Sequence, residues 1–340
     1  MPAQPRLVNG LEPLPTLQAD ASLHTMPGEA STVEGLNNLV EAAWQVRRAN
    51  WPDVITASLP VDTLPISVTG HSCALNCAHC GGHYLGGMHS LAELGTTGAS
   101  SLLVSGGCDR AGRVPIRQHL DELRPHLVGR RVNWHLGLVS DDDLAAIAPL
   151  GGTVSFDFVG DDETINEVYG LSATADDYER CLERIGRKMR VVPHVTIGLR
   201  AGRIGHEWRA LERLTRHRFD SLVFLVLVPT AGTAYAQAQP PSLADVAAVM
   251  ATARLRFPRL SLQLGCMRPA GDYRLKLDEL AVRLGANVIV NPTRPARQLA
   301  EALGLEWTQQ HECCVFNAEP GPAPVAAQAD RHMTGGLWRP

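Results

Sequence analysis

The sequence predicts an α/β fold in which eight strand–helix units close into a (β/α)8 barrel of the TIM type. Short apolar runs alternate with helical patterns along most of the chain, and this alternation is typical of a parallel sheet. The eight units span about 230 residues, a length that suits one closed barrel. An apolar content of 45% is enough for the core of such a barrel. A doubly wound open sheet is the alternative.

Each strand is predicted where a short apolar run lies between polar or turn-forming residues. The runs cover residues 64–69, 101–105, 132–139, 153–159, 191–199, 221–228, 260–264 and 287–290. Helices are predicted where apolar residues recur every three or four positions, as they do from Leu36 to Val46. The helical patterns cover residues 34–49, 141–148, 175–185, 243–255 and 273–284.

The chain divides into an arm, a barrel domain and a tail. Residues 1–34 are rich in Pro, Ala and Thr and show no sustained period, which predicts a flexible N-terminal arm. Residues 35–316 carry the strand–helix alternation and form the predicted barrel domain. Pro, Ala and Gly return in residues 317–340, which we interpret as a C-terminal tail.

Composition narrows the function classes. A net charge of −4 gives no general attraction to nucleic acid or to an anionic membrane. The N-terminus lacks the apolar core of a signal peptide, and no apolar run approaches the roughly 20 residues that span a bilayer. We therefore expect a cytoplasmic protein without nucleic-acid or membrane partners. Its eight cysteines are then expected to be thiols or metal ligands rather than disulfides.

Three cysteines lie within eight residues, in the segment H-S-C-A-L-N-C-A-H-C-G-G-H-Y. Cys73, Cys77 and Cys80 follow the first predicted barrel strand, and a barrel places such a loop at its C-terminal face, where active sites are built. Structural zinc sites and electron-transfer clusters normally take four protein ligands. Three thiols can bind three irons of a [4Fe-4S] cubane and leave the fourth open. Zinc with His79 or His83 as a fourth ligand is the alternative.

The C-x3-C-x2-C motif directly after this strand resembles the radical S-adenosylmethionine (SAM) superfamily, which has a barrel fold of this kind. The resemblance implies that Cys73, Cys77 and Cys80 bind a [4Fe-4S] cluster whose open iron binds SAM. It also implies that one electron cleaves SAM to a 5′-deoxyadenosyl radical, which abstracts hydrogen from an unactivated carbon. One departure is His79, because the residue before the third cysteine is often aromatic in this superfamily.

Three segments later in the chain extend the resemblance. Ser105, Gly106 and Gly107, in S-G-G-C, match a Gly-Gly motif whose backbone receives the amino group of SAM. His194, in H-V-T-I-G-L, lies in a segment similar to the one that packs against adenine. The apolar run V-F-L-V-L-V-P-T is similar to the next strand, which flanks the base.

The segment S-F-D-F-V-G-D supplies two more candidate ligands. Ser155 and Asp157 alternate along a predicted strand, so both are expected to point into the barrel. The resemblance implies that they contact the ribose or the methionyl group of SAM. A structural role for Asp157 at the strand end is the alternative.

The remaining cysteines suggest a second iron–sulfur cluster. Cys181 lies within a helical pattern and is expected to be a buried core residue. Cys108 and Cys266 end predicted strands, and Cys313 and Cys314 follow the last strand and helix. All four are expected at the face that carries the first cluster, where they could ligate an auxiliary cluster. Ordinary free thiols are the alternative.

Adjacent cysteines rarely bind one cluster together. At least one of Cys313 and Cys314 is therefore expected to be a ligand, and if only one binds, an arginine such as Arg268 could complete the site.

A second cluster beside a radical site is typical of sulfur insertion, because a carbon radical needs a nearby sulfide to trap it. Residues 65–88, with S-G-G-C-D-R-A-G-R-V-P, G-C-M-R-P-A-G-D and the C-terminal Glu-Cys-Cys, are most similar to the biotin-synthase-like proteins that act in pairs as a two-component lipoyl synthase. The resemblance covers residues 65–316. It implies sulfur insertion into an octanoyl group on a lipoyl-carrier protein, a homologous radical SAM partner and an electron donor. Radical SAM chemistry without sulfur insertion, or a non-catalytic metal or electron-transfer protein, is the alternative.

Ten basic residues lie between Arg184 and Arg218. A solvated helical face explains such a stretch, and docking of an acidic carrier domain is the functional alternative.

Overall fold

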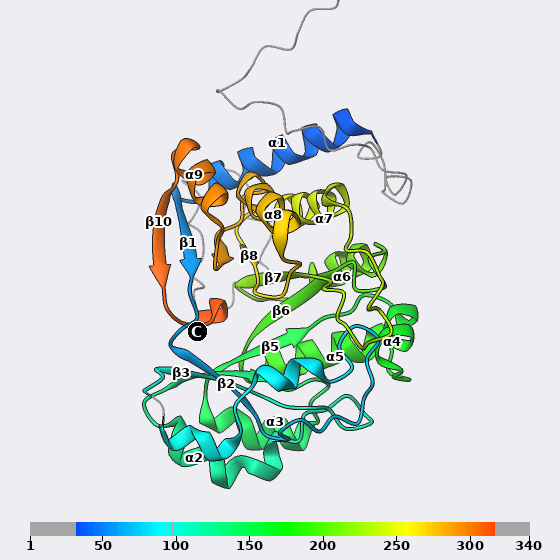
Figure 1. Ribbon diagram of the computed structural model, residues 1–340, viewed down its shortest axis with the longest axis vertical. Coiled ribbons are helices and arrows are strands. Elements are labelled where there is room, and N and C mark those ends of the chain that lie inside the picture. Colours follow the sequence, from blue (N-terminus) through cyan, green and yellow to red (C-terminus); the bar gives the residue numbers. More distant parts are fainter. Residues whose placement is uncertain (1–31, 97, 317–340) are drawn as a thin grey trace, which may run out of the picture.

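The structure is a computed structural model that describes residues 32–96 and 98–316. Within these residues ten strands form one sheet, in the order β10-β1-β9-β8-β7-β6-β5-β4-β3-β2, and all neighbouring strands are parallel. Helices lie around the outside of this curved sheet (Figure 1). Most of the predicted arm (residues 1–34) and the whole predicted tail (residues 317–340) lie outside the described residues.

All eight predicted strands are present, and the predicted parallel barrel-type fold is confirmed. The strands are β1 (Val54–Ser58), β2 (Thr63–Ser67), β3 (Ser101–Ser105), β4 (Arg131–His135), β5 (Thr153–Asp157), β6 (Arg190–Ile197), β7 (Ser221–Val226), β8 (Ser261–Leu264), β9 (Val288–Val290) and β10 (Glu306–Gln310).

The five predicted helices are also present, with others between them. The α-helices are α1 (Val33–Asn50), α2 (Leu120–Leu127), α3 (Asp141–Ile147), α4 (Asp162–Tyr169), α5 (Ala175–Gly186), α6 (His206–Leu214), α7 (Leu243–Arg256), α8 (Gly271–Arg283) and α9 (Arg294–Ala302). Short 3-10 helices are η3 (His83–Gly87), η4 (Leu91–Thr96), η5 (Ile116–His119), η6 (Ala148–Leu150) and η7 (Cys314–Phe316).

Strands β1 and β10 were not predicted. The sequence of β10, E-W-T-Q-Q, carries little apolar signal because most of the strand is exposed at the edge of the sheet. Strand β1 is a five-residue run just after Trp51-Pro52, and it pairs with both β9 and β10. These two strands widen the predicted eight-stranded sheet to ten.

The two end strands, β2 and β10, do not pair with each other within the described part of the chain. Residues 311–316, which we call the C-terminal hook, instead run from β10 to the start of β2. The N–H of Asp62 donates to the carbonyl oxygen of His311 at 2.8 Å. The N–H of Cys313 donates to the hydroxyl oxygen of Thr63, also at 2.8 Å. The gap in the barrel wall is thus bridged by the hook rather than by a strand pair.

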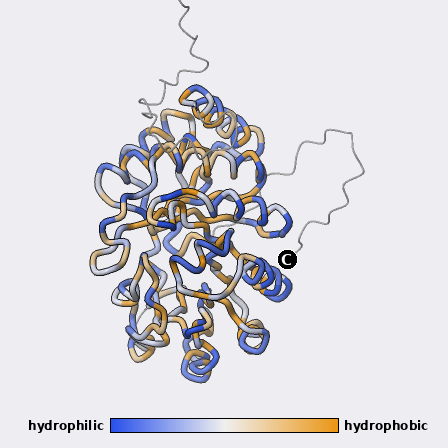
Figure 2. The backbone as a smooth tube through the Cα atoms, turned by 90° about the vertical axis from the view of Figure 1, so that its right-hand side faces the viewer, coloured by the Kyte–Doolittle hydropathy of each residue, from blue (hydrophilic) through white to orange (hydrophobic). Residues whose placement is uncertain are grey.

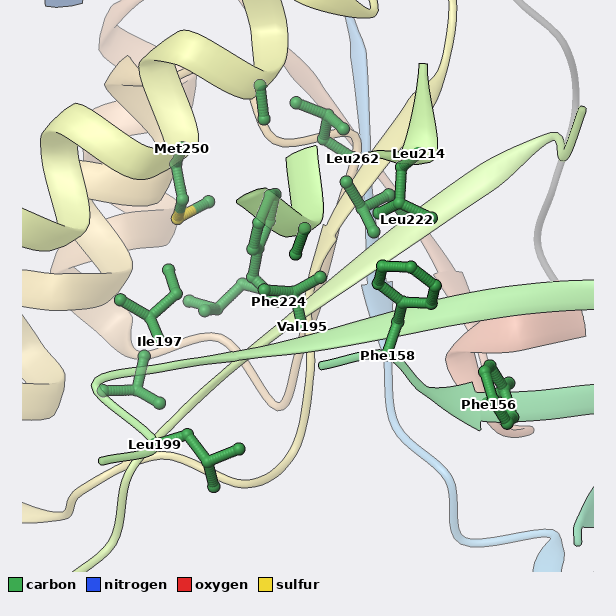
Figure 3. Close-up of a cluster of buried hydrophobic side chains, with 14 of the residues drawn as sticks. Phe156, Phe158, Val195, Ile197, Leu199, Leu214, Leu222, Phe224, Met250 and Leu262 are labelled. Carbon is green, nitrogen blue, oxygen red and sulfur yellow. The ribbon is translucent and has the colours of Figure 1, made fainter. Parts of the chain in front are cut away.

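The main core lies between the sheet and the surrounding helices. Figure 3 shows side chains from neighbouring strands, such as Phe156 of β5, Val195 of β6 and Phe224 of β7, with Met250 of α7. Hydrophobic residues gather in the interior of the molecule, and many of the outer segments are hydrophilic (Figure 2). Alternate residues of the same strands are left to face the barrel interior.

A second, smaller apolar cluster fills part of that interior. Its members are Val192, Val223, Val288, Val290, Cys314 and Val315. The hook therefore supplies two of the side chains that strands β6, β7 and β9 pack against.

Candidate active site

The segment between β2 and η3 carries the three clustered cysteines, and we call residues 70–82 the cysteine loop. Its backbone turns sharply at Gly70, Gly81 and Gly82, whose φ angles of 59°, 52° and 79° are positive. Glycine adopts such angles without a steric penalty. The loop lies at the C-terminal face of the sheet, as predicted, because it follows the end of β2.

The cysteine loop packs directly against the S-G-G-C segment after β3. A Cβ atom on Gly107 would lie 2.0 Å from the carbonyl oxygen of Ser72 and 2.6 Å from the Cα of Cys73, so only glycine fits there. The N–H of Gly107 donates to the Thr69 hydroxyl at 2.7 Å. The N–H of Cys108 donates to the sulfur of Cys73 at 3.3 Å. Gly107 therefore holds the loop in place, and its N–H already has a partner.

The thiols of the loop lie close to one another and to Cys108. Burial raises the pKa of Cys77 to about 12, and the neighbouring Cys80 and Cys73 raise it further. Burial likewise raises the pKa of Cys108 to about 12, followed by the effects of Cys73 and Cys77. No group of three or more His, Cys, Asp or Glu side chains in the described part of the chain is arranged to hold a single metal ion.

A cavity of about 130 Å³ opens beneath the cysteine loop, at the C-terminal ends of β3, β4 and β5. Its lining includes Cys77, Ser105, Gly106, Cys108, His135 and Asp157. Four predicted site residues, Cys77, Ser105, Gly106 and Asp157, therefore meet at one cavity. Cys108, predicted as a ligand of the second cluster, lies here as well.

His135 is a site residue that the sequence analysis did not identify. Its Nε2 lies 3.1 Å from Asp157 Oδ2, and its Nδ1 lies 3.5 Å from the Ser105 hydroxyl. The side chains of His135 and Asp157 are 37% and 42% exposed, and the cavity is what exposes them. The signal in the sequence was the polar alternation of Asn133 and His135 in an otherwise apolar strand.

The His135–Asp157 pair favours a charged state on both partners. Burial alone would raise the pKa of Asp157, but the charge and hydrogen bond of His135 outweigh it and lower that pKa to about 2. Burial alone would lower the pKa of His135, and Asp157 reverses this effect, so the pKa rises above its usual value. The cavity therefore presents a carboxylate in contact with an imidazole whose protonated form it favours.

Two other histidines near Asp157 are kept neutral. Burial lowers the pKa of His194 to about 4, and its Nδ1 donates to the carbonyl oxygen of Val192 at 3.0 Å. Burial also lowers the pKa of His79 to about 4. The His79 ring packs against Tyr84 and Tyr169, with centroids 6.1 and 5.6 Å away. His79 thus acts as a packed ring beside the cysteines.

Ser155 lies deeper in the barrel than the sequence analysis expected. Its hydroxyl donates to the side-chain oxygen of Asn133 at 2.8 Å, and both residues are buried. The amide nitrogen of Asn133 donates to the sulfur of Cys313 at 3.5 Å. Ser155 therefore belongs to a hydrogen-bonded layer that leads toward the C-terminal hook.

The hook contacts this layer and the N-terminal ends of β2, β4 and β6. Arg131, the first residue of β4, pairs with Glu312 at 2.7 Å and donates to the carbonyl oxygen of Phe316. Arg190, the first residue of β6, donates to the carbonyl oxygen of Val315 at 2.6 Å. The hook also meets C-terminal strand ends, because the hydroxyl of Ser58, the last residue of β1, donates to the carbonyl oxygen of Glu312 at 2.9 Å. The expectation that Cys313 and Cys314 emerge at the same face as the cysteine loop therefore stays a prediction.

The two hook cysteines are joined by a hydrogen bond between their sulfur atoms. The Cys314 thiol donates to Cys313, which lowers the pKa of Cys313 to about 7. Hydrogen bonds from the Val315 N–H and from Asn133 lower it further, against the effect of burial. The same bond to Cys313 raises the pKa of Cys314. The ionised form of Cys313 is thus favoured relative to an ordinary thiol.

Cys266 groups with the hook and not with Cys108. It is solvent-accessible after the end of β8, yet burial, followed by the charge of Cys313, raises the pKa of its thiol. An accessible sulfur that is enclosed by protein is typical of a cavity wall. The four predicted auxiliary ligands therefore separate into Cys108 beside the cysteine loop and Cys266, Cys313 and Cys314 near one another.

Two further predictions concern single residues. Arg268 was a possible completing ligand, but its guanidinium binds the carboxylate of Asp278 and the carbonyl oxygens of Gly265 and Val290. These buried contacts give it a structural role. Cys181 is buried on α5 against the carbonyl oxygen of Val139, and the prediction of a core residue is confirmed.

The basic stretch from Arg184 to Arg218 is neutralised within the chain. Eight of its ten basic residues lie within 4.0 Å of a carboxylate, such as Arg190 at Asp220 and Arg213 at Glu179. The structure thus favours the explanation by ion pairs on helical faces. None of the helices in residues 32–96 and 98–316 is long and apolar enough to cross a membrane.

Comparisons with known proteins place the fold. No protein-family model matches the chain, and no curated protein matches it in sequence. Among solved structures it is similar to methylornithine synthase (PylB), with 14% identity, a TM-score of 0.59 and coverage of 84% of this chain and 92% of that one. It is also similar to the FeFe-hydrogenase maturase HydG from Carboxydothermus hydrogenoformans, with 14% identity, a TM-score of 0.57 and coverage of 85% and 75%. The chain shares the fold of these two enzymes.

Proposed function

We propose that the chain is a radical SAM enzyme that binds a [4Fe-4S] cluster through Cys73, Cys77 and Cys80. The observation that carries the proposal is the position of these cysteines, on a loop that follows a parallel strand and lies over a cavity at the C-terminal face. The shared fold with two solved enzymes supports this reading of the motif.

The residues fit such a cofactor. The loop turns on three left-handed glycines, and its three thiols lie near enough to perturb one another electrostatically. Ser105, Gly106 and Asp157 line the cavity beside them, where SAM would bind. When bound, the cluster and SAM supply a 5′-deoxyadenosyl radical that removes a hydrogen atom from carbon.

The chain's own side chains would orient SAM and exclude water from the site. Asp157 is a carboxylate held by His135, so it can accept hydrogen bonds from the ribose hydroxyls or from the amino group of SAM. The neutral His194 can lie beside adenine without introducing a charge. Val192, Val223, Val288 and Val290 pack with Val315 and exclude water from the lower part of the barrel.

We further propose that the enzyme inserts sulfur from an auxiliary iron–sulfur cluster, as one component of a lipoyl synthase. Cys313, with Cys266 and Cys314 nearby, supplies thiolate chemistry inside the barrel. His135 lies between this group and the cavity under the cysteine loop, because its charge interacts with Cys313 while its ring contacts Ser105. An extended octanoyl chain that enters from the C-terminal face would therefore meet both sulfur groups. A lipoyl-carrier protein, a homologous radical SAM partner and an electron donor would complete the reaction.

A product assay tests this proposal. The anaerobically purified chain, its partner, a reductant, SAM and an octanoylated carrier peptide should yield 5′-deoxyadenosine together with thiolated peptide. Peptide mass separates one from two inserted sulfur atoms. If SAM is cleaved and no thiolated peptide forms with any octanoyl carrier, the sulfur-inserting part of the proposal is wrong.

A second candidate function is radical SAM chemistry without sulfur insertion. The observation that favours it is the separation of Cys108 from Cys266, Cys313 and Cys314, which leaves fewer thiols for the second cluster than the sequence suggested. In this case the hook would close the barrel for structural reasons. Full SAM cleavage by a chain that lacks the hook thiols, with an unchanged product, would identify this function.

A further inference from the structure

The backbone of the cysteine loop is fixed at Ala78, between Cys77 and Cys80. The N–H of Ala78 donates to the carbonyl oxygen of Val168, at the end of α4, at 2.7 Å. The carbonyl oxygen of Ala78 accepts from the N–H of Tyr235 at 2.9 Å. Both backbone groups of one residue are therefore held, from opposite sides, by two segments that are about 70 residues apart in sequence.

The two holding segments are themselves joined by Glu167. This carboxylate, next to Val168 on α4, accepts a hydrogen bond from the hydroxyl of Tyr235 at 2.8 Å. Ala78, Val168, Glu167 and Tyr235 thus form a closed ring of contacts, which we call the loop clamp. Most of the Tyr235 side chain is buried, so its ring is held in one place while the hydroxyl reaches Glu167.

Two arginines after β6 hold Glu167 in its ionised form. Arg200 and Arg203 donate to its two oxygens, at 2.5 and 2.9 Å. Burial alone would raise the pKa of Glu167, but the hydrogen bonds of Tyr235 and Arg200 outweigh it and lower the pKa. A charged acceptor makes a stronger hydrogen bond to the phenol than a neutral one.

We propose that Glu167 is a positioning residue that acts through Tyr235 to hold the cysteine loop in the geometry that the cluster needs. This inference rests on the proposed function for its consequence, but the clamp itself exists in the protein without any cofactor. A contact of η3, directly after the loop, agrees with it. The hydroxyl of Tyr84 lies 3.2 Å from that of Thr230, at the start of the segment that carries Tyr235.

The chain offers a matched control for Glu167. Glu163 lies one turn earlier on α4 and also pairs with Arg200. No contact joins it to Tyr235 or to the cysteine loop among the described residues. Glu163→Gln therefore removes one carboxylate from the same helix and the same arginine while leaving the clamp intact.

Hydrogen exchange of the purified full chain tests the clamp without a cofactor. Peptides that cover residues 74–82 report the Ala78 amide. In Tyr235→Phe this amide should exchange roughly fivefold faster than in the wild type, the effect of losing about one hydrogen bond. In Glu167→Gln the amide should also exchange faster, but by less, because the Gln side-chain oxygen still accepts from Tyr235 without a charge. Glu163→Gln should exchange it at the wild-type rate. If this exchange is unchanged in both Glu167→Gln and Tyr235→Phe, Glu167 and Tyr235 do not hold Ala78. The same conclusion follows if Glu163→Gln accelerates exchange as much as Glu167→Gln does.

The electron paramagnetic resonance spectrum of the reduced, iron-loaded chain with SAM tests the consequence. The g values should shift in Glu167→Gln and Tyr235→Phe and stay unchanged in Glu163→Gln. If exchange accelerates while the spectrum and SAM cleavage match the wild type, the positioning role is wrong. If the wild type itself binds no iron, the proposed function fails, whereas the exchange result still decides the clamp.

Discussion

The cysteine loop and the C-terminal hook present sulfur to the same barrel interior in different ways. The loop comes from the C-terminal ends of the strands, and burial raises the pKa of its Cys77 to about 12. The hook follows the end of β10 and binds Thr63 at the start of β2, and hydrogen bonds lower the pKa of its Cys313 to about 7. A thiol with a raised pKa needs a metal charge to become a thiolate, whereas Cys313 is already near that state at neutral pH. The two regions are therefore suited to different parts of one reaction.

The difference also concerns how each region is held. The loop is fixed by neighbours close to the C-terminal face, such as Gly107 and the loop clamp. The hook is fixed by the first residues of strands, Thr63, Arg131 and Arg190. Substitutions in one region should consequently leave the structure of the other region unchanged.

The largest effect is expected at the loop. Replacing Cys73, Cys77 or Cys80 singly by Ala should lower reductive SAM cleavage by more than about 100-fold. Losing a residue that only hydrogen-bonds to a metal ligand costs about 10–100-fold, and losing a ligand itself should cost more. Chromatographic measurement of 5′-deoxyadenosine checks this. Cys181→Ala is the control, because Cys181 is a buried core residue on α5. Formation of 5′-deoxyadenosine at the wild-type rate by the triple variant would refute the assignment.

A separable effect is expected at the hook. Cys313→Ala and Cys266→Ala should keep SAM cleavage within about threefold of the wild type, since neither residue contacts the cysteine loop, while thiolated product is lost. Product mass and 5′-deoxyadenosine are measured in the same reaction. Thiolated product from a variant that lacks Cys108, Cys266, Cys313 and Cys314 together would contradict a sulfur source at these residues.

Packing of the loop on β3 predicts a stability effect. Gly107→Ala should lower the free energy of unfolding by about 1–3 kcal/mol, because its Cβ would meet the backbone of Ser72 and Cys73. Gly86→Ala is the matched control, since nothing lies within 4 Å of a Cβ there. Denaturant titration of both variants checks the prediction. Equal stability of the two variants would show that the close approach of loop and strand is not as described.

The smallest effect is a pH dependence of the His135–Asp157 pair. The pKa of His135 is raised on folding, so its stabilisation is present below about pH 6.5 and is lost as the pH rises through the folded value. The wild type should exceed His135→Gln in stability by about 0.2–1 kcal/mol at pH 6, the range for accessible ion pairs, and by less at pH 9. Denaturant titration at both pH values measures the difference. A difference that grows with pH would contradict a charged pair.

The sequence allowed most of the wall of the barrel to be predicted, because buried parallel strands are continuous apolar runs. It also allowed the cysteine loop to be placed, since a loop after a strand of such a sheet has one possible face. Strand β10 escaped prediction because an exposed edge strand has no apolar period. The position of the hook depends on contacts such as that of Cys313 with Thr63, which are 250 residues apart.

The His135–Asp157 pair shows a similar limit within the site. The strand that carries His135 was predicted, but its role depends on a partner in the next strand. A period of two can indicate which residues face inward, and it does not say which of them meet across neighbouring strands. The division of Cys108 from Cys266, Cys313 and Cys314 likewise follows from the path of the hook, which depends on contacts distant in sequence.

Iron and sulfide analysis of the anaerobically reconstituted chain tests most directly the claim that two separate sulfur groups bind clusters. The wild type should bind about eight irons per chain if both clusters are cubanes. A variant with Ala at Cys73, Cys77 and Cys80 and a variant with Ala at Cys266, Cys313 and Cys314 should each keep about four. An iron content equal to that of the wild type in the second variant would contradict the account.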